Sequence, residues 1–142
     1  MKRVIKGSEY INAMAIINPR LCRERSVQIE IEQRNEGPIP HLHVYLDKTR
    51  NPKNCAYIRL DKAEYAPHHT SAKMSRQQKK DFIEIMTAIA PKQYTVSIIN
   101  GEERHATGYQ NAVEIWIETY GETVDFPYDD EGFPAMPDYS VL

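Results

Sequence analysis

The chain has 142 residues, 41% of them hydrophobic and 27% charged, which is the composition of an ordinary folded domain and excludes a disordered or fibrous protein. The length predicts one domain with a sizeable core, and only two cysteines exclude a disulfide framework. No apolar run approaches the roughly 20 residues that span a bilayer. We therefore expect a cytoplasmic protein without a membrane partner.

The net charge of −2 hides an uneven distribution of charge along the chain. Residues 1–100 contain 17 Lys and Arg against 10 Asp and Glu, whereas residues 101–142 contain 1 against 10. A basic body and an acidic end can attract each other, or can bind different partners. The simpler alternative is surface charge that only keeps the fold soluble.

Four segments in the first half of the chain have the pattern of strands. Residues 13–17 form a short apolar run that stops at a proline, which predicts a buried strand. Apolar and polar residues then alternate over residues 27–32, 41–47 and 55–61, as they do in strands with one buried face. Short turn-rich links join these last three segments, so we expect an antiparallel meander.

The second half of the chain contains two predicted helices. Ser75 and Gln78 have capping-box spacing ahead of a helical apolar stripe that should end at Pro91. Residues 95–99 then predict a short strand. Thr107 and Gln110 repeat the capping-box spacing.

The second helix carries an apolar stripe that includes Trp116, and Gly121 occupies the position of a terminator. Ile115 and Ile117 fall off that stripe, which indicates burial on more than one side. The fold class is therefore α+β: an antiparallel meander with two amphipathic helices packed on one face. We expect one domain over residues 1–125 and an extended acidic, aromatic C-terminal arm over residues 126–142, laid on the body or on a partner subunit.

The strand that begins at His41 carries the most suggestive side chains. Leu42, Val44 and Leu46 share one face, so His41, His43 and Tyr45 project from the other. In a meander that polar face would also present Glu30 or Glu32, together with Tyr57 and Arg59. Imidazole and carboxylate suit zinc, manganese or nickel, and a metal-bound water could hydrolyse phosphate esters.

Other roles for the histidines remain open at this stage. His41 and His43 can equally be structural, with hydrogen bonds to the backbone or to neighbouring carboxylates. His68, His69 and His105 are expected in loops, where binding residues often lie. Adjacent histidines point in different directions, so at most one of His68 and His69 would join a site with the strand pair.

A basic and aromatic surface is the alternative binding site. Arginine binds phosphate in bidentate fashion and tyrosine stacks on bases, so this surface predicts a nucleotide or nucleic-acid ligand. The acidic end could cap it, or could mimic nucleic acid toward a basic protein. The residues that would contribute are Arg20, Arg23, Arg25, Arg34, Lys48, Arg50, Lys53, Arg59, Lys62, Tyr45, Tyr57 and Tyr65.

The stretch Pro40-His41-Leu42-His43-Val44 resembles the Pro-Pro-His-x-His-Val strand motif of a widespread bacterial domain of unknown function. The similarity covers about residues 38–90 and includes the order of strand and helix, with a longer insert between them and Pro38-Ile39-Pro40 in place of paired prolines. The resemblance implies a small accessory protein of bacteria and mobile elements, often found beside toxin–antitoxin-like neighbours. It implies no established reaction.

Two functions follow as hypotheses. The first is a non-enzymatic accessory protein of a bacterium, phage or mobile element, such as a defence-related or toxin–antitoxin-related inhibitor. Such a protein would bind a protein, nucleotide or nucleic acid, and it could dimerise through its C-terminal arm. The second is a metal-dependent hydrolase or ribonuclease with His41 and His43 as metal ligands. No catalytic residue is assigned, and no cofactor is expected apart from that divalent metal. The binding residues are predicted to be His41, His43, Tyr45, Tyr57, Arg59 and Arg50.

Overall fold

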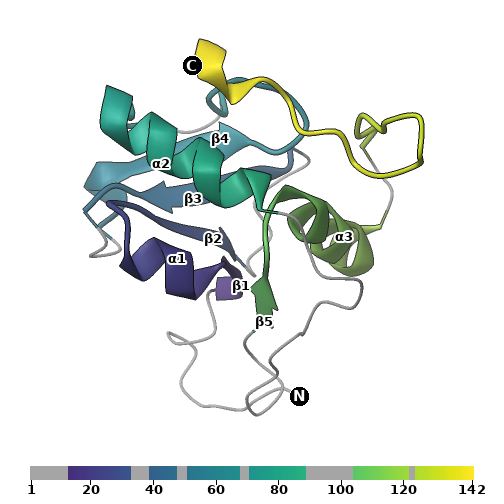
Figure 1. Ribbon diagram of the computed structural model, residues 1–142, viewed down its shortest axis with the longest axis horizontal. Helices are drawn as coiled ribbons and strands as arrows, with labels where there is room; N and C mark the ends of the chain where they lie inside the picture. Colours follow the sequence, from purple (N-terminus) through teal and green to yellow (C-terminus); the bar gives the residue numbers. More distant parts are fainter. Residues whose placement is uncertain (1–12, 33–38, 48–50, 68–70, 89–103, 122–123) are drawn as a thin grey trace.

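The computed structural model describes six stretches of the chain: residues 13–32, 39–47, 51–67, 71–88, 104–121 and 124–142. Within them a five-stranded sheet has the order β4-β3-β2-β1-β5. Its strands are β1 (Ala13–Ile17), β2 (Gln28–Glu32), β3 (His41–Tyr45), β4 (Cys55–Arg59) and β5 (Arg104–Ala106). Strands β1 to β4 form an antiparallel meander, and β5 joins the far edge parallel to β1 (Figure 1). The prediction of an α+β fold built on an antiparallel meander is confirmed.

The predicted strands correspond to β1, β2, β3 and β4: β1 is a continuous apolar run, and alternating apolar residues supply a buried face of the other three. Strand β5 was not predicted, and it places the backbone of His105 in the sheet, so the expectation of a loop there is wrong. Its register with β1 pairs Ile16 with His105. The predicted strand over residues 95–99 lies outside the described residues.

A five-residue helix that the sequence pattern does not predict, α1 (Pro19–Arg23), follows β1 directly. Its N-cap is Asn18, with a left-handed φ of 44° and a side chain that accepts from the N–H of Leu21. Pro19 occupies the first helical position, where its fixed φ suits a helix and its missing N–H costs nothing. The proline that ends β1 therefore starts a helix.

Helix α2 (Arg76–Thr87) begins with the predicted capping box. The Ser75 hydroxyl accepts from the N–H of Gln78, and the Gln78 side chain accepts from the N–H of Ser75, at 3.1 and 2.8 Å. The helix ends at Thr87, with Ala88 already extended at ψ 133°. The prediction that it continues to Pro91 is therefore wrong, since the backbone turns away several residues earlier.

Asp81, which the sequence presents as a polar position of α2, is only 5% exposed. Its carboxylate accepts from the Ser26 hydroxyl at 2.5 Å and from the Gln77 amide at 2.9 Å. These bonds tie α2 to the segment that leads into β2. A buried carboxylate is stable when its hydrogen bonds are supplied in this way.

Helix α3 (Tyr109–Tyr120) has Gly108 as its N-cap, so the predicted cap at Thr107 is wrong. The N–H of Thr107 instead donates to the side chain of Asn111 at 3.1 Å. At the other end Gly121 has a φ of 81° and donates its N–H to the carbonyl of Ile117, which confirms the predicted terminator.

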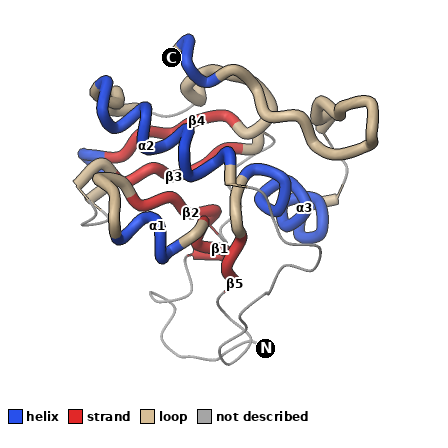
Figure 2. Tube along the Cα trace, in the orientation of Figure 1, coloured by secondary structure: helices blue, strands red, loops and turns tan. Residues whose placement is uncertain are grey.

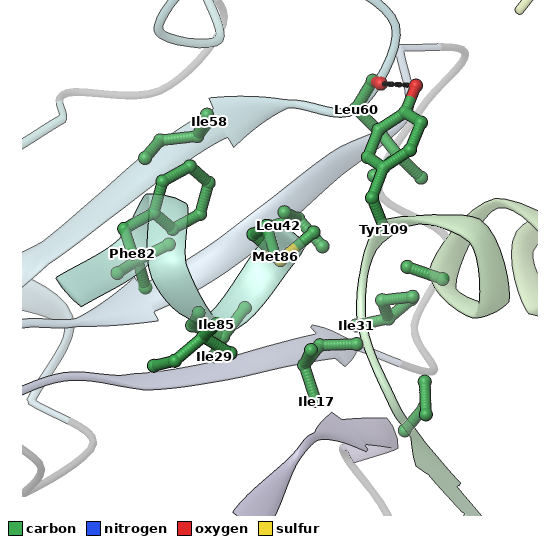
Figure 3. Close-up of a cluster of buried hydrophobic side chains, with 14 of the residues drawn as sticks. Ile17, Ile29, Ile31, Leu42, Ile58, Leu60, Phe82, Ile85, Met86 and Tyr109 are labelled. Carbon is green, nitrogen blue, oxygen red and sulfur yellow. Dashed lines mark hydrogen bonds between the residues drawn. The ribbon is translucent and has the colours of Figure 1, made fainter. Parts of the chain in front are cut away.

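One hydrophobic core joins the sheet to the helices. Phe82, Ile85 and Met86 of α2 are at most 1% exposed and belong to the same cluster as Ile29 and Leu42 of the sheet (Figure 3). Burial of each such side chain contributes about 1.5–3 kcal/mol to folding. Ile115 is buried as well, as expected for a helix covered on more than one side.

The C-terminal segment 124–142 returns to this core and ends in a short 3-10 helix, η3 (Tyr139–Val141) (Figure 2). Tyr139 is 1% exposed, packs edge-on against Phe82 at 5.0 Å between ring centroids, and donates its hydroxyl to the carbonyl of Arg59 at 2.7 Å. Phe126 is also buried in the core cluster. Within the described part of the chain, no helix has the length and apolar character needed to cross a membrane.

Candidate functional site

The histidine strand β3 is buried on both of its faces. Leu42 and Val44 lie in the main core with no exposed surface. On the other face His41, His43 and Tyr45 are 1%, 8% and 7% exposed. The predicted division of the strand into two faces is thus present, and the polar face is enclosed almost as completely as the apolar one.

The two imidazoles form a stacked pair. Their ring centroids lie 5.2 Å apart with an interplanar angle of 24°. The Nδ1 of His41 is 2.9 Å from the carbonyl oxygen of Ile39. A carbonyl only accepts, so Nδ1 carries a proton and donates to it.

Tyr57 of β4 contacts both rings through edge-on packing. Its centroid is 4.9 Å from that of His43 and 6.2 Å from that of His41. Such perpendicular geometry is favourable for aromatic rings because the positive edge of one meets the negative face of the other. The strand register places His43 directly opposite Tyr57, so the contact follows from the predicted meander.

A buried carboxylate completes this row across the sheet. Register places Glu30 of β2 opposite His43, and Glu30 has no exposed surface. Its carboxylate accepts from the Gln28 amide at 2.6 Å. The sequence left Glu30 and Glu32 as alternatives; the register selects Glu30, and the Glu32 side chain lies outside the described residues.

A smaller apolar cluster encloses one end of the polar face, formed by Tyr45, Cys55, Tyr57 and Ala66. The loop after β4 supplies Ala66, whose N–H donates to the carbonyl of Tyr57 at 2.7 Å. Ser71 extends the contact by accepting from the N–H of Tyr57 at 2.9 Å. The loop therefore follows the outer edge of β4 and covers part of the face that carries the imidazoles.

Arg59, the predicted phosphate-binding residue of β4, is engaged within its own chain. Its guanidinium donates two hydrogen bonds to Asp61, at 3.0 and 2.9 Å, and lies 3.5 Å from Glu64. The hydrogen bond to Asp61 raises the pKa of Arg59, against the opposing effect of burial. Arg25 is likewise paired with Glu84 through two hydrogen bonds, at 3.0 and 2.8 Å.

The remaining predicted site residues are not brought to this face by any described contact. His68, His69 and Arg50 lie outside the described residues, as does the His105 side chain. Among the side chains that the structure describes, no three His, Cys, Asp or Glu residues are grouped closely enough to hold a metal. A metal on His41 and His43 therefore stays a prediction.

A second feature, which is not predicted from the sequence, is a groove of about 450 Å³ between α2 and η3. Lys79 fixes one wall by donating to the carbonyls of Ser140 and Leu142 at 3.0 and 2.8 Å. In the sequence, Arg76, Lys79 and Lys80 have i, i+3, i+4 spacing. This spacing indicates one basic face of a helix, and it is the sequence pattern from which the groove's charge could have been predicted. The lining residues are Met74, Arg76, Lys79, Lys80, Ile83 and Ser140.

The fold and these two features define a small α+β domain with an enclosed histidine–tyrosine face and a separate basic groove. Comparison of the chain with known proteins found no matching family model, no matching curated protein and no matching solved structure.

Proposed function

We propose that this chain is a non-enzymatic accessory protein of a bacterium, phage or mobile element that binds a macromolecular partner or a phosphate-bearing ligand. The observation that carries the proposal is the burial of His41 and His43, at 1% and 8% exposure. A general base or a metal-bound water must come within hydrogen-bond reach of its substrate. Enclosed imidazoles serve the packing of the sheet better than they serve attack on a polymer.

The finer architecture belongs to the same proposal. The two longer helices act as amphipathic covers of the core face, and residues 126–142 act as an acidic arm that takes part in recognition. Two facts support this: Phe82, Ile85 and Met86 of α2 are buried among sheet residues, and Tyr128 and Phe133 of the arm are about half exposed, at 52% and 48%.

The alternative, a metal-dependent hydrolase or ribonuclease, is favoured by one specific observation. His43 has the buried carboxylate of Glu30 opposite it on β2 and is stacked with His41 on β3. Two imidazoles and a carboxylate are a common ligand set for divalent metals. In the observed conformation these three side chains are not grouped closely enough to hold an ion, so binding would require them to move together. Substrate would then have to enter through a rearrangement of the segments that cover this face.

The experiment that separates these functions is a turnover assay on the purified full chain. Cleavage of single-stranded RNA, double-stranded DNA and a phosphodiester dye is measured with zinc, manganese or nickel, together with bound metal. His43→Phe keeps a ring against Tyr57 and removes the ligand, and Tyr45→Phe is the matched control on the same face. We expect no turnover in any variant. Metal-dependent cleavage that is lost in His43→Phe and kept in Tyr45→Phe would overturn the binding proposal.

A further inference from the structure

The basic groove between α2 and η3 combines charge with apolar surface. Met74 and Ile83 supply apolar lining, while Arg76, Lys79 and Lys80 supply three positive charges. No carboxylate is among the described residues that line it. Its volume of about 450 Å³ falls in the range of ligand-binding clefts. This chemistry fits an acidic segment that also carries large apolar side chains.

The C-terminal segment contains a stretch of that composition. The turn over residues 128–133 presents three exposed carboxylates, those of Asp129, Asp130 and Glu131, between the exposed rings of Tyr128 and Phe133. Tyr128, Phe133 and Val141 are the large exposed hydrophobic residues of the described chain. Val141 belongs to η3, which forms one wall of the groove. Exposed apolar surface therefore occurs on the turn and beside the groove.

The turn is held in shape by its own hydrogen bonds. The Asp129 carboxylate accepts from the N–H groups of Glu131 and Phe133, both at 2.9 Å. Gly132 adopts a φ of 86° and donates its N–H to the carbonyl of Asp129. A preformed turn loses little conformational entropy on binding, which favours its use as a recognition element.

We propose that the acidic turn of one copy of this protein docks into the basic groove of a second copy. The inference rests on the proposed binding function and names its partner as the same chain. The carboxylates of Asp130 and Glu131 would pair with Arg76 and Lys80, and Phe133 would enter the apolar part of the groove. Opposite charges at the rim steer the encounter, and the buried ring supplies most of the contact.

A single copy cannot make this contact with itself in the observed conformation. Asp129 and Pro134 lie beside Thr87 and Ala88, at the C-terminal end of α2. The two groove cations that would pair with the turn, Arg76 and Lys80, lie roughly 16 and 10 Å from Thr87 along the helix axis, at the helical rise per residue. Figure 2 shows the C-terminal 3-10 helix above α2, and the loop that precedes it further to the right, beyond the end of the helix. The contact is therefore between copies. It closes into a dimer if two copies exchange turns, and it adds further copies at higher concentration if they do not.

The test is sedimentation equilibrium of the full chain over a range of concentrations. Wild type should show an average mass that rises with concentration and falls again in high salt, because the rim pairs are screened. The groove variant Arg76→Glu with Lys80→Glu should remain monomeric, and so should the turn variant Asp130→Lys with Glu131→Lys. A mixture of the two should associate again, because each now carries the charge that its partner lost.

A control pair with the same change in charge separates this contact from a general effect of net charge. Glu24→Lys with Asp125→Lys makes the same change in charge as the turn variant, at two exposed carboxylates outside the groove and the turn, and should associate as wild type does. A tenfold or greater rise in the dissociation constant is expected only for the groove and turn variants. Monomeric wild type at every concentration, equal loss in the control pair, or no recovery in the mixture would overturn this inference. None of these results affects the turnover assay. A failure of the docking inference can therefore be told apart from a failure of the proposed function.

Discussion

Gly108, the N-cap of α3, is the position where one added methyl group should do most damage. A Cβ there would lie 2.4 Å from the carbonyl oxygen of Ala88, 2.9 Å from that of Met86 and 3.2 Å from that of Ile85. All three contacts are with the backbone at the end of α2, which cannot rotate aside as a side chain would. Overpacking of a rigid site costs about 1–3 kcal/mol. We expect Gly108→Ala to lower the free energy of unfolding by about 3 kcal/mol, the upper end of that range.

The substitution Gly108→Ser is a second test, because helix capping and close packing predict opposite effects for it. Serine is a favoured N-cap and α3 has no side-chain cap bond, so capping alone would make this change stabilising by a few tenths of a kcal/mol. If close packing dominates, serine and alanine should destabilise to a similar extent. Urea denaturation followed by circular dichroism measures both.

Gly121→Ala is the control for the loss of a glycine. Gly121 has a φ of 81° but nothing lies within 4 Å of the point that an added Cβ would occupy, so its cost is conformational alone, about 1–2 kcal/mol. The reasoning is refuted if Gly108→Ala costs no more than Gly121→Ala, or if Gly108→Ser is more stable than wild type. Either result would mean that the ends of α2 and α3 separate readily.

Two further predictions concern buried polar groups. Tyr139→Phe keeps the ring and removes its hydrogen bond to the Arg59 carbonyl, so urea denaturation should show a loss of about 1 kcal/mol. Burial by itself raises the pKa of Asp81, but hydrogen bonds from Ser26 and Gln77 lower it below its ordinary value of 3.8. Its stabilisation is therefore present above pH 3.8 and lost as pH falls through the lowered pKa. Thermal melts of Asp81→Asn should show less acid sensitivity than wild type; an unchanged pH profile would contradict this assignment.

The meander was predictable because β2, β3 and β4 alternate between apolar and polar residues and are joined by short links, while β1 is a short apolar run. Strand β5 was not, because it has only three residues and is held by backbone pairing with β1, which leaves no pattern in side chains. The burial of Glu30 was equally hidden: a glutamate in an alternating strand predicts an exposed face, and only the register opposite His43 places it inside. Helix α2 was predicted by its cap. The buried position of Asp81 was not, because its carboxylate accepts a hydrogen bond from Ser26, which is 55 residues away in the sequence.

The basic groove illustrates why a site can escape sequence reasoning even when its residues follow a regular pattern. Arg76, Lys79 and Lys80 mark one helical face, but a basic face alone is usually solvated surface. The groove exists because η3 returns across 61 residues to accept from Lys79 through the Ser140 carbonyl. That return depends on Tyr139, which enters the core beside Phe82. The acidic turn lines a different cavity, at the C-terminal end of α2, so in the proposed docking the surfaces that match in charge and apolar character belong to different copies of the chain.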